Sequence, residues 1–359
     1  MTDAATARTL QLSLDHFRTD HPESPSASLL VETPAFAWEG ACGFSDPTHR
    51  IPMNTGDSIY TASVAKTITA VVALRVVEEG LLDLDETLAA YLPAKLLDGL
   101  HEFNGQSYSE QITVRDLLGH TSGLADSFGS PGFMDLIVGD PERVWRPEET
   151  VAFIKEECEP LFAPGTGFHY SDVNYNLAGL AIEAVTGDSL DAAYRQYVYE
   201  PVGLTSTYRR FVEAPRGAAG SRVAHVFHGD IDFTEWRALT ADWAGGGLNS
   251  TLGDMNRFLR ALACDEIFRE AATRATMFRW KRWSENASYG LGVMRIDLDA
   301  DADASRHGLG EVWGHTGASS CYMFYWPKAN ATFCGTFNQV ACERAILPFV
   351  TDVMRRIQS

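Results

Sequence analysis

The sequence predicts an α/β fold in which both ends of the chain contribute strands and the middle of the chain is mainly helical. Runs rich in aromatic and β-branched residues occur near the N-terminus and again in the last third. Between them, apolar residues recur at helical spacing. We therefore expect residues 1–80 and 242–359 to form one discontinuous α/β domain, and residues 81–241 to form a mainly helical insertion.

The N-terminal part predicts a helix, a strand pair and a second helix. The two strands flank the turn signal Thr33-Pro34 and should pair as a hairpin. The apolar run that begins at Ser63 should continue as a helix until Gly80 stops it. The expected elements are a helix at 5–20, strands at 28–32 and 36–44, a loop at 47–57, a helix at 63–80 and a short acidic helix at 81–92.

The rest of the chain predicts short helices followed by strands. Gly187 should close an apolar helix, Pro201 should break the next, and the unpatterned residues 209–241 should form a long loop. The expected helices lie at 113–118, 148–157, 174–186, 189–198, 251–264 and 347–357. The expected strands lie at 289–298, 311–314, 320–326 and 331–337, with an acidic loop at 299–308.

The charge balance restricts the classes of partner. The chain has a net charge of -19, with 29 Lys plus Arg against 48 Asp plus Glu. Nucleic acids and anionic membranes attract clustered basic residues, so neither is an expected partner. No apolar run is long enough to span a bilayer. Residues 1–15 lack the basic and apolar regions of a signal peptide, which favours a cytoplasmic location. A second copy of the same chain is a possible partner, so a homo-oligomer stays an open alternative.

Neither a metal nor an organic cofactor is expected. The six cysteines contain no C-x-x-C pair and predict free thiols. His225 and His228 are the nearest approach to a zinc motif, but no third ligand lies beside them. Gly245 to Gly247 lacks the lysine and spacing of a phosphate-binding loop, so these glycines indicate close backbone packing.

A candidate nucleophile lies at the start of the helix at 63–80. In Ser63-Val64-Ala65-Lys66 the serine and lysine are three residues apart and share a helix face. The lysine could serve as the base that a serine nucleophile needs, and burial in an apolar helix would lower the pKa of Lys66. Taken alone, S-x-x-K is a weak motif, because a helix-capping serine beside an unrelated lysine looks the same.

Two further motifs follow in order along the chain. Tyr170-Ser171-Asp172 directly precedes an apolar helix, and His315-Thr316-Gly317 lies among the late strands. With these motifs the chain resembles the penicillin-recognising serine hydrolases, the family of class C β-lactamases, DD-peptidases, D-aminopeptidases and related esterases. Residues 117–124, 162–167 and 245–251 also fit that pattern. The resemblance implies an antiparallel sheet flanked by helices, together with a helical domain.

The resemblance also implies a role for each motif residue. Ser63 would be the acylated nucleophile, and Lys66 and Tyr170 would share the general-base role, with Tyr170 helping to activate water in deacylation. The backbone N–H groups of Ser63 and Ala318 would form the oxyanion hole. The substrate-binding residues would be Asp172, His315, Thr316 and Gly317.

Two of these positions depart from the commoner family pattern. Lys is more usual at the position of His315, and a histidine gives a weaker, pH-dependent attraction for a substrate carboxylate. Together with Lys66, it could still lower the pKa of Tyr170. Asn is frequent at the position of Asp172; a carboxylate cannot donate a hydrogen bond to a substrate amide oxygen, although it can hold Lys66.

Other residues have weaker claims on function. His120, within Gly-His-Thr-Ser-Gly, is interpreted as a structural turn residue, and His169 as a packing or capping residue. Four residues of the unpatterned loop could line a substrate cleft or simply pack the loop: His225, His228, Trp236 and Trp243.

The main hypothesis is a serine hydrolase that forms an acyl-enzyme with small amides, peptides or esters. A cytoplasmic location favours a D-amino-acid amidase, a D-peptidase or a carboxylesterase, and an exported DD-carboxypeptidase or β-lactamase is the alternative. An α/β-hydrolase is disfavoured, because no serine has glycine at both flanking positions of a nucleophile elbow. A metal hydrolase would depend on His225 and His228 alone. A catalytically inactive binding module is the alternative from another class.

Overall fold

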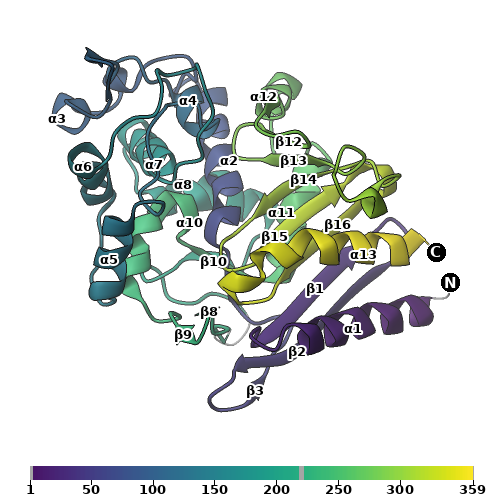
Figure 1. Cartoon of the computed structure of the whole chain (residues 1–359). Coiled ribbons are helices and arrows are strands. Elements are labelled where there is room, and N and C mark those ends of the chain that lie inside the picture. The colour runs from purple at the N-terminus through teal and green to yellow at the C-terminus, as the bar shows by residue number, and fades with distance from the viewer. Residues whose placement is uncertain (1–2, 218–221, 359) are drawn as a thin grey trace.

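A single antiparallel sheet joins the two ends of the chain. The computed structural model describes residues 3–217 and 222–358. Its nine-stranded sheet has the order β11-β12-β13-β14-β15-β16-β1-β2-β3 (Figure 1). The N-terminal strands are β1 (Ser26–Glu32), β2 (Ala37–Asp46) and β3 (Ile51–Pro52); the C-terminal ones are β11 (Lys281–Arg282), β12 (Ala287–Tyr289), β13 (Met294–Asp297), β14 (Glu311–Thr316), β15 (Tyr322–Trp326) and β16 (Ala331–Thr336).

The two halves of the sheet meet where β1 pairs with β16, with Ser28 opposite Thr336. The β1–β2 hairpin forms as the turn at Thr33-Pro34 predicts, with Glu32 opposite Ala37. The predicted α/β fold with an antiparallel sheet is therefore confirmed. The boundaries of the two predicted domains stay a prediction.

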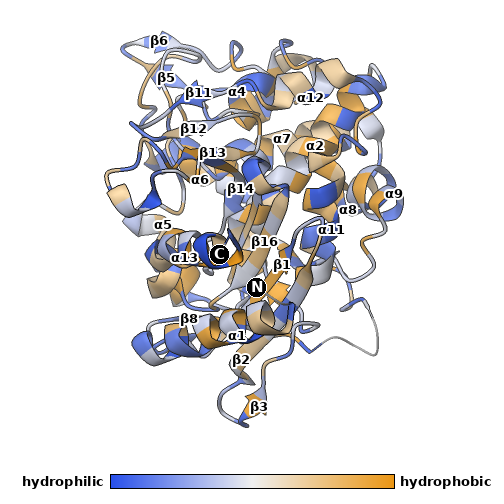
Figure 2. Cartoon of the chain, turned by 90° about the vertical axis from the view of Figure 1, so that its right-hand side faces the viewer, coloured by the Kyte–Doolittle hydropathy of each residue, from blue (hydrophilic) through white to orange (hydrophobic). Residues whose placement is uncertain are grey.

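Helices from both chain ends cover one face of the sheet. Helices α1 (Asp3–Asp20) and α13 (Ile346–Gln358) lie side by side on this face (Figure 1). Their apolar residues and those of the sheet form one core, in which the rings of Phe17 and Phe337 stack with centroids 3.7 Å apart. Figure 2 shows β1 and β16 in largely hydrophobic colours between the helices.

The opposite face of the sheet carries the helices that position the site. Helix α11 (Leu252–Ala263) packs on β15 and β16, and α2 (Ala65–Glu78) is buried over nearly all of its length. Helix α2 contacts α7 (Val173–Thr186), which Gly187 closes in the left-handed conformation as expected. A capping box at Thr113 and Asp116 begins α4 (Val114–Leu118), also as expected.

The remaining elements are short. Helices α3 (Ala94–Leu97), α5 (Pro131–Gly139), α6 (Pro147–Glu157), α8 (Leu190–Tyr194), α9 (Glu200–Val202), α10 (Trp243–Gly246) and α12 (Ala271–Met277) complete the helical layer, and β4 (Ile59–Tyr60), β10 (Leu248–Ser250) and β7 (Tyr208–Arg209) form a three-stranded sheet. Two small hairpins are β5 (Glu102–Phe103) with β6 (Gln106–Ser107), and β8 (Phe227–His228) with β9 (Ile231–Asp232).

Two predictions of helix extent are wrong. Residues 81–92 contain only a 3-10 turn at Leu88–Ala90. The Asp83 side chain accepts the backbone N–H of Asp85, a local turn that competes with helix formation. Pro201 does not break the following helix, because a π-helical turn at Arg195–Tyr199 leads into α9 and places the proline in its first turn.

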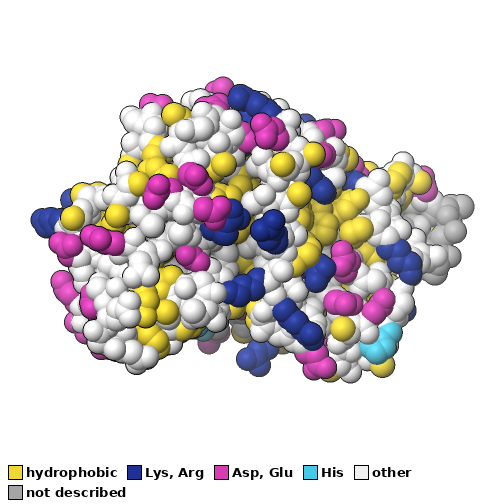
Figure 3. All heavy atoms as spheres, turned by 90° about the horizontal axis from the view of Figure 1, so that it is seen from above, with side chains coloured by type: hydrophobic (Ala, Val, Ile, Leu, Met, Phe, Trp, Pro, Cys, Tyr) yellow, Lys and Arg dark blue, Asp and Glu magenta, His cyan; other side chains and the backbone are white. Residues whose placement is uncertain are grey.

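The face of the molecule seen from above carries both signs of charge. On the face in Figure 3, Lys and Arg side chains are interspersed with Asp and Glu and with hydrophobic side chains. No helix in residues 3–217 and 222–358 combines the length and hydropathy needed to cross a membrane.

Substitution of Phe17 tests the core between α1 and the sheet. Phe17 is 6% exposed and packs on Phe337 and Phe349, whereas Leu12 of the same helix is 47% exposed. Phe17→Ala should lower the free energy of unfolding by about 3–5 kcal/mol, and Leu12→Ala by about 0.5 kcal/mol or less. Urea unfolding followed by circular dichroism measures both. Equal effects of the two substitutions would show that α1 does not complete this core.

Candidate active site

Ser63 lies at a strained turn between a strand and a helix. Strand β4 ends at Tyr60, and the 3-10 turn Ala62–Val64 leads directly into α2. Ala62 has a φ of 45°, which is costly for a residue with a Cβ. Strain of this kind persists where the surrounding structure enforces it, often at functional sites. The turn leaves Ser63 partly accessible while its neighbours are buried.

Lys66 is fully buried in the first turn of α2 and has three partners. Its Nζ donates to Ser63 Oγ at 3.0 Å and to the Gly245 carbonyl oxygen at 2.8 Å. The third partner is the Asp172 carboxylate, which forms an ion pair with the ammonium. A buried ammonium requires such a carboxylate and such acceptors, so Asp172 holds Lys66 as the sequence suggested.

Tyr170 and Asp172 enter the site from the N-terminus of α7. Asp172 is the N-cap residue, but its side chain makes no capping bond and instead meets Lys66. Its backbone N–H donates to Asp126 Oδ1 at 3.0 Å. The Tyr170 ring centroid is 5.1 Å from Lys66 Nζ. The Tyr170-Ser171-Asp172 motif therefore brings a phenol ring and a carboxylate next to the ammonium of Lys66.

His120 packs against the ring of Tyr170. It has a φ of 56°, is fully buried, and its ring centroid lies 4.2 Å from that of Tyr170. Its Nδ1 accepts the backbone N–H of Ser171 at 3.2 Å. Burial and then the charge of Lys66 lower the pKa of His120 well below its usual value, so the ring is neutral. This placement agrees with a structural turn residue.

The end of β14 lies directly against the Ser63 turn. A Cβ on Gly317 would come within 2.3 Å of the Thr61 carbonyl oxygen, and its position is 3.2 Å from Ser63 N. Only a glycine allows this approach. The next residue, Ala318, is exposed, and its backbone N–H has no acceptor in the described part of the chain. The two segments that would carry the oxyanion hole thus lie in contact, and the role of the Ser63 and Ala318 N–H groups stays a prediction.

His315 does not carry the charge expected of it. The side chain is buried, with Nε2 2.9 Å from the Tyr289 hydroxyl and Nδ1 2.6 Å from the Thr316 carbonyl oxygen. Burial and then the charge of Lys66 lower the pKa of His315 to about 3. A neutral ring cannot help to lower the pKa of Tyr170, so that expectation is wrong. Thr316 is half-buried beside it, and substrate binding by either residue stays a prediction.

The protonation of Lys66 also differs from the prediction. Burial alone would lower the pKa of Lys66, but Asp172, Tyr170 and Asp242 together raise it well above the usual value. Burial raises the pKa of Tyr170, against the smaller opposing effect of Lys66. The resting site therefore holds an ammonium and a neutral phenol.

Two carboxyl groups of the site were not found from the sequence. Burial and then the negative charge of Asp172 raise the pKa of Asp126 and of Asp242 to about 7. Three carboxyl groups therefore surround the single ammonium of Lys66. Asp126 and Asp242 lie far from Lys66 along the chain and in no recognisable motif, so only the fold reveals them.

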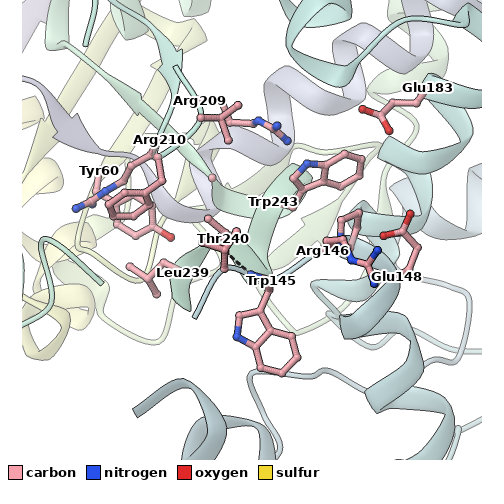
Figure 4. A pocket seen from close by; sticks show the side chains of 15 residues that line it. Tyr60, Trp145, Arg146, Glu148, Glu183, Arg209, Arg210, Leu239, Thr240 and Trp243 are labelled. Atoms are coloured by element: carbon pink, nitrogen blue, oxygen red, sulfur yellow. Dashed lines mark hydrogen bonds between the residues drawn. The ribbon is translucent and has the colours of Figure 1, made fainter. Parts of the chain in front are cut away.

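A separate cavity lies beyond the 242–247 segment. Its volume is about 340 Å³, and Tyr60, Trp145, Arg209 and Trp243 are among its lining residues (Figure 4). Neither Ser63 nor Lys66 lines it. Trp243, a candidate cleft residue, thus faces this cavity.

His225 and His228 belong to no group of potential metal ligands in the described residues. His225 Nδ1 lies 2.7 Å from Asp232, and His228 joins no group of potential ligands. Within residues 3–217 and 222–358, only His21, Glu23 and Cys342 approach one another as metal ligands could. His21 and Glu23 follow α1 and Cys342 precedes α13, so none of the three belongs to a catalytic motif.

The sequence model of the family described as Beta-lactamase matches residues 19–345. The chain belongs to the beta-lactamase family. It is 30% identical to a lovastatin esterase from Penicillium rubens, over 84% of this chain and 83% of that protein. It is 28% identical to penicillin-binding protein 4 from Amycolatopsis lactamdurans, over 88% and 80% of the two chains.

Solved structures of the beta-lactamase family share the fold. A D-amino acid amidase from Ochrobactrum anthropi SV3 superposes with a TM-score of 0.81 at 22% identity, over 99% of each chain. A D-stereospecific amidohydrolase from Streptomyces sp. gives a TM-score of 0.76 at 26% identity, over 94% of this chain and 95% of that one. The chain is accordingly a serine hydrolase of this family that acts on amides or esters.

The raised pKa of Asp126 predicts a pH-dependent stability. Its folded pKa of about 7 exceeds the unfolded value, so the folded state binds more protons between about pH 4 and 7. Stability from this group is therefore lost as pH rises through that window. Asp126→Asn keeps an acceptor for the Asp172 N–H and removes this loss.

Calorimetry at several pH values measures the effect of Asp126→Asn. Its Tm relative to the wild type should rise by about 2–4 °C between about pH 5 and 8, since roughly 2–3 kcal/mol of linkage is divided by an unfolding entropy of about 2 cal/mol/K per residue. A difference in Tm that is constant with pH would show that Asp126 ionises normally.

Gly317→Ala tests the contact between β14 and the Ser63 turn. The new Cβ would displace Thr61 or Ala62 and misalign the oxyanion hole, so acylation of Ser63 should slow by about 10²-fold. Gly56→Ala is the matched control, because a Cβ there meets nothing within 4 Å. Reaction with a fluorophosphonate, followed by intact mass, measures both rates. Normal acylation of a folded Gly317→Ala protein would contradict this arrangement.

Proposed function

We propose that the protein hydrolyses amides or esters of small amino-acid-like acyl groups through an acyl-enzyme on Ser63. The single observation that carries this proposal is the buried Lys66 ammonium, which contacts Ser63 Oγ and Asp172 together. D-amino acid amides are the favoured substrates and small carboxylic esters the second class. The names of the amidase, amidohydrolase and esterase relatives support these two classes.

Acylation begins with generation of the base. One ammonium proton of Lys66 passes to the Asp172 carboxylate within their ion pair, which leaves a neutral amine 3.0 Å from Ser63 Oγ. The amine takes the Ser63 proton as Oγ bonds to the substrate carbonyl carbon. The N–H groups of Ser63 and Ala318 bind the developing oxyanion. Collapse of the tetrahedral intermediate breaks the bond to the leaving group, which departs with a proton supplied through Lys66 or Tyr170.

Deacylation reverses these roles with water as the nucleophile. Tyr170 lies above the Lys66 ammonium and next to Ser63, where its oxygen can orient a water toward the acyl carbon. The water proton passes to the Tyr170–Lys66 pair, and Ser63 Oγ recovers a proton as the acid departs. No metal or organic cofactor takes part in this proposed sequence.

The charges of the site favour substrates without a carboxylate. The histidine that replaces the commoner lysine is neutral, and the Lys66 ammonium is already paired with Asp172. His315 and Lys66 therefore offer no free positive charge to a substrate carboxylate, whereas partial ionisation of Asp126 and Asp242 near neutral pH favours the ammonium of an unblocked amino acid amide. This distribution disfavours the alternatives of a penicillin-directed β-lactamase and a DD-carboxypeptidase. A cytoplasmic location is part of the same proposal, and cell fractionation tests it.

The test combines trapping of Ser63 with a comparison of substrates. A fluorophosphonate should add one adduct to the wild type and none to Ser63→Ala. D-phenylalanine amide should be hydrolysed faster than L-phenylalanine amide and than N-acetyl-D-phenylalanine amide, because acetylation removes the ammonium. Penicillin G should acylate slowly or not at all. Absence of a Ser63 adduct, or preference for penicillin, would overturn the proposal.

A further inference from the structure

Asp242 is a buried carboxyl group that the proposed mechanism does not use. It is 7% exposed and lies at the N-cap of α10, yet its side chain makes no capping hydrogen bond. Its Oδ1 is buried without a hydrogen-bond partner in the described residues. A carboxyl group in this state is costly, so the surrounding structure must enforce its position.

The glycines of the 245–247 segment bring Asp242 next to the catalytic lysine. The ideal Cβ position of Gly245 lies 2.5 Å from Asp242 Oδ1, 3.3 Å from Lys66 Nζ and 3.5 Å from Asp172 Oδ1. A Cβ on Gly246 would overlap Asp242 Oδ2. Three ionisable side chains therefore occupy the space where a side chain at position 245 would begin, and only glycine leaves room for them.

The segment that carries Asp242 is fixed on both sides. Gly245 accepts from Lys66, and the Ala244 carbonyl oxygen accepts from Thr69 Oγ1 at 2.7 Å. On the other side, the Trp243 ring packs on Gly179 of α7, and Trp243 has a φ of 34°. Asp242 is therefore held toward Lys66 by α2 and α7 together.

We propose that Asp242 is a positioning residue that acts through Lys66 and switches the reactivity of Ser63 with pH. While Asp242 keeps its proton, the Lys66 ammonium is balanced by Asp172 and exchanges a proton with it. When Asp242 releases its proton to solvent, a second negative charge holds the ammonium, and the neutral amine becomes rarer. Ser63 then loses its base.

The groups that face Asp242 together raise its pKa. Lys66 of α2 and the hydroxyl of Tyr60 from β4 favour its ionised form, whereas Asp172 of α7, Asp126 of the loop after α4 and burial favour its protonated form. The negative charge of ionised Asp242 also raises the pKa of Tyr194 of α8. Burial and Asp172 prevail, which raises the pKa of Asp242 to about 7. The change of charge therefore falls near neutral pH.

Labelling of Ser63 by a fluorophosphonate measures the effect without knowledge of the substrate, although the inference rests on the proposed function. In the wild type the second-order rate should reach a maximum near about pH 7 and fall above it. Asp242→Asn imitates the protonated form. It should label within about twofold of the wild type at about pH 6, and at least about fivefold faster than the wild type at about pH 8.5.

Two more variants separate this role from a general loss of structure. Tyr60→Phe removes a hydrogen bond that favours ionised Asp242, so the alkaline fall should move to higher pH. Asp254→Asn is the matched control: Asp254 is 4% exposed and binds Ser206 N and Thr207 Oγ1, away from Lys66. This control should leave the pH of the fall unchanged.

The outcomes distinguish failure of the two proposals. No labelling of the wild type at any pH would overturn the acyl-serine mechanism itself. Normal labelling with the same alkaline fall in Asp242→Asn and Tyr60→Phe would leave that mechanism intact and overturn the role of Asp242. If Asp242→Asn does not fold, the Tyr60→Phe profile decides alone.

Discussion

The site depends on one buried positive charge. Lys66 lies in a helix that is buried over nearly all of its length, where an unpaired ammonium would cost several kcal/mol. The Asp172 carboxylate and the Gly245 carbonyl oxygen stabilise the ammonium there. Helix α7 must therefore present its N-terminus to α2, and the 242–247 segment must turn tightly between them. The positions of Tyr170 and Ser63 follow from the same requirement.

The sequence predicted those parts of the fold and site that depend on neighbouring residues. Tyr170 and Asp172 reach Lys66 from a distant helix, and only the family resemblance predicted that contact. Ser63 and Lys66, by contrast, meet because they share a helix face. The β1–β2 hairpin and the cap at Thr113 likewise follow from local signals. Their physical causes act within a few residues.

The features that the sequence did not predict arise from contacts between distant segments. The charge state of His315 depends on its burial beside Tyr289. That of Lys66 depends on two carboxyl groups and a phenol, Asp172, Asp242 and Tyr170, from two distant segments. Helix α5 lies in a stretch whose Gly and Pro residues obscure helical periodicity. A local contact also explains why the helix predicted at 81–92 does not form: the Asp83 side chain accepts the backbone N–H of Asp85.

The pairing of β1 with β16 has a consequence for the growing chain on the ribosome. The nucleophile and its lysine emerge early, but Ala318 follows only after the whole helical middle of the chain. The sheet closes only after β16 has emerged, because β1 lacks its partner until then. A nascent chain thus carries Ser63 without the second N–H of the oxyanion hole. We therefore expect hydrolytic activity only after Ala318 and β16 have emerged, and two separately made fragments divided between α12 and β14 should be inert until they associate.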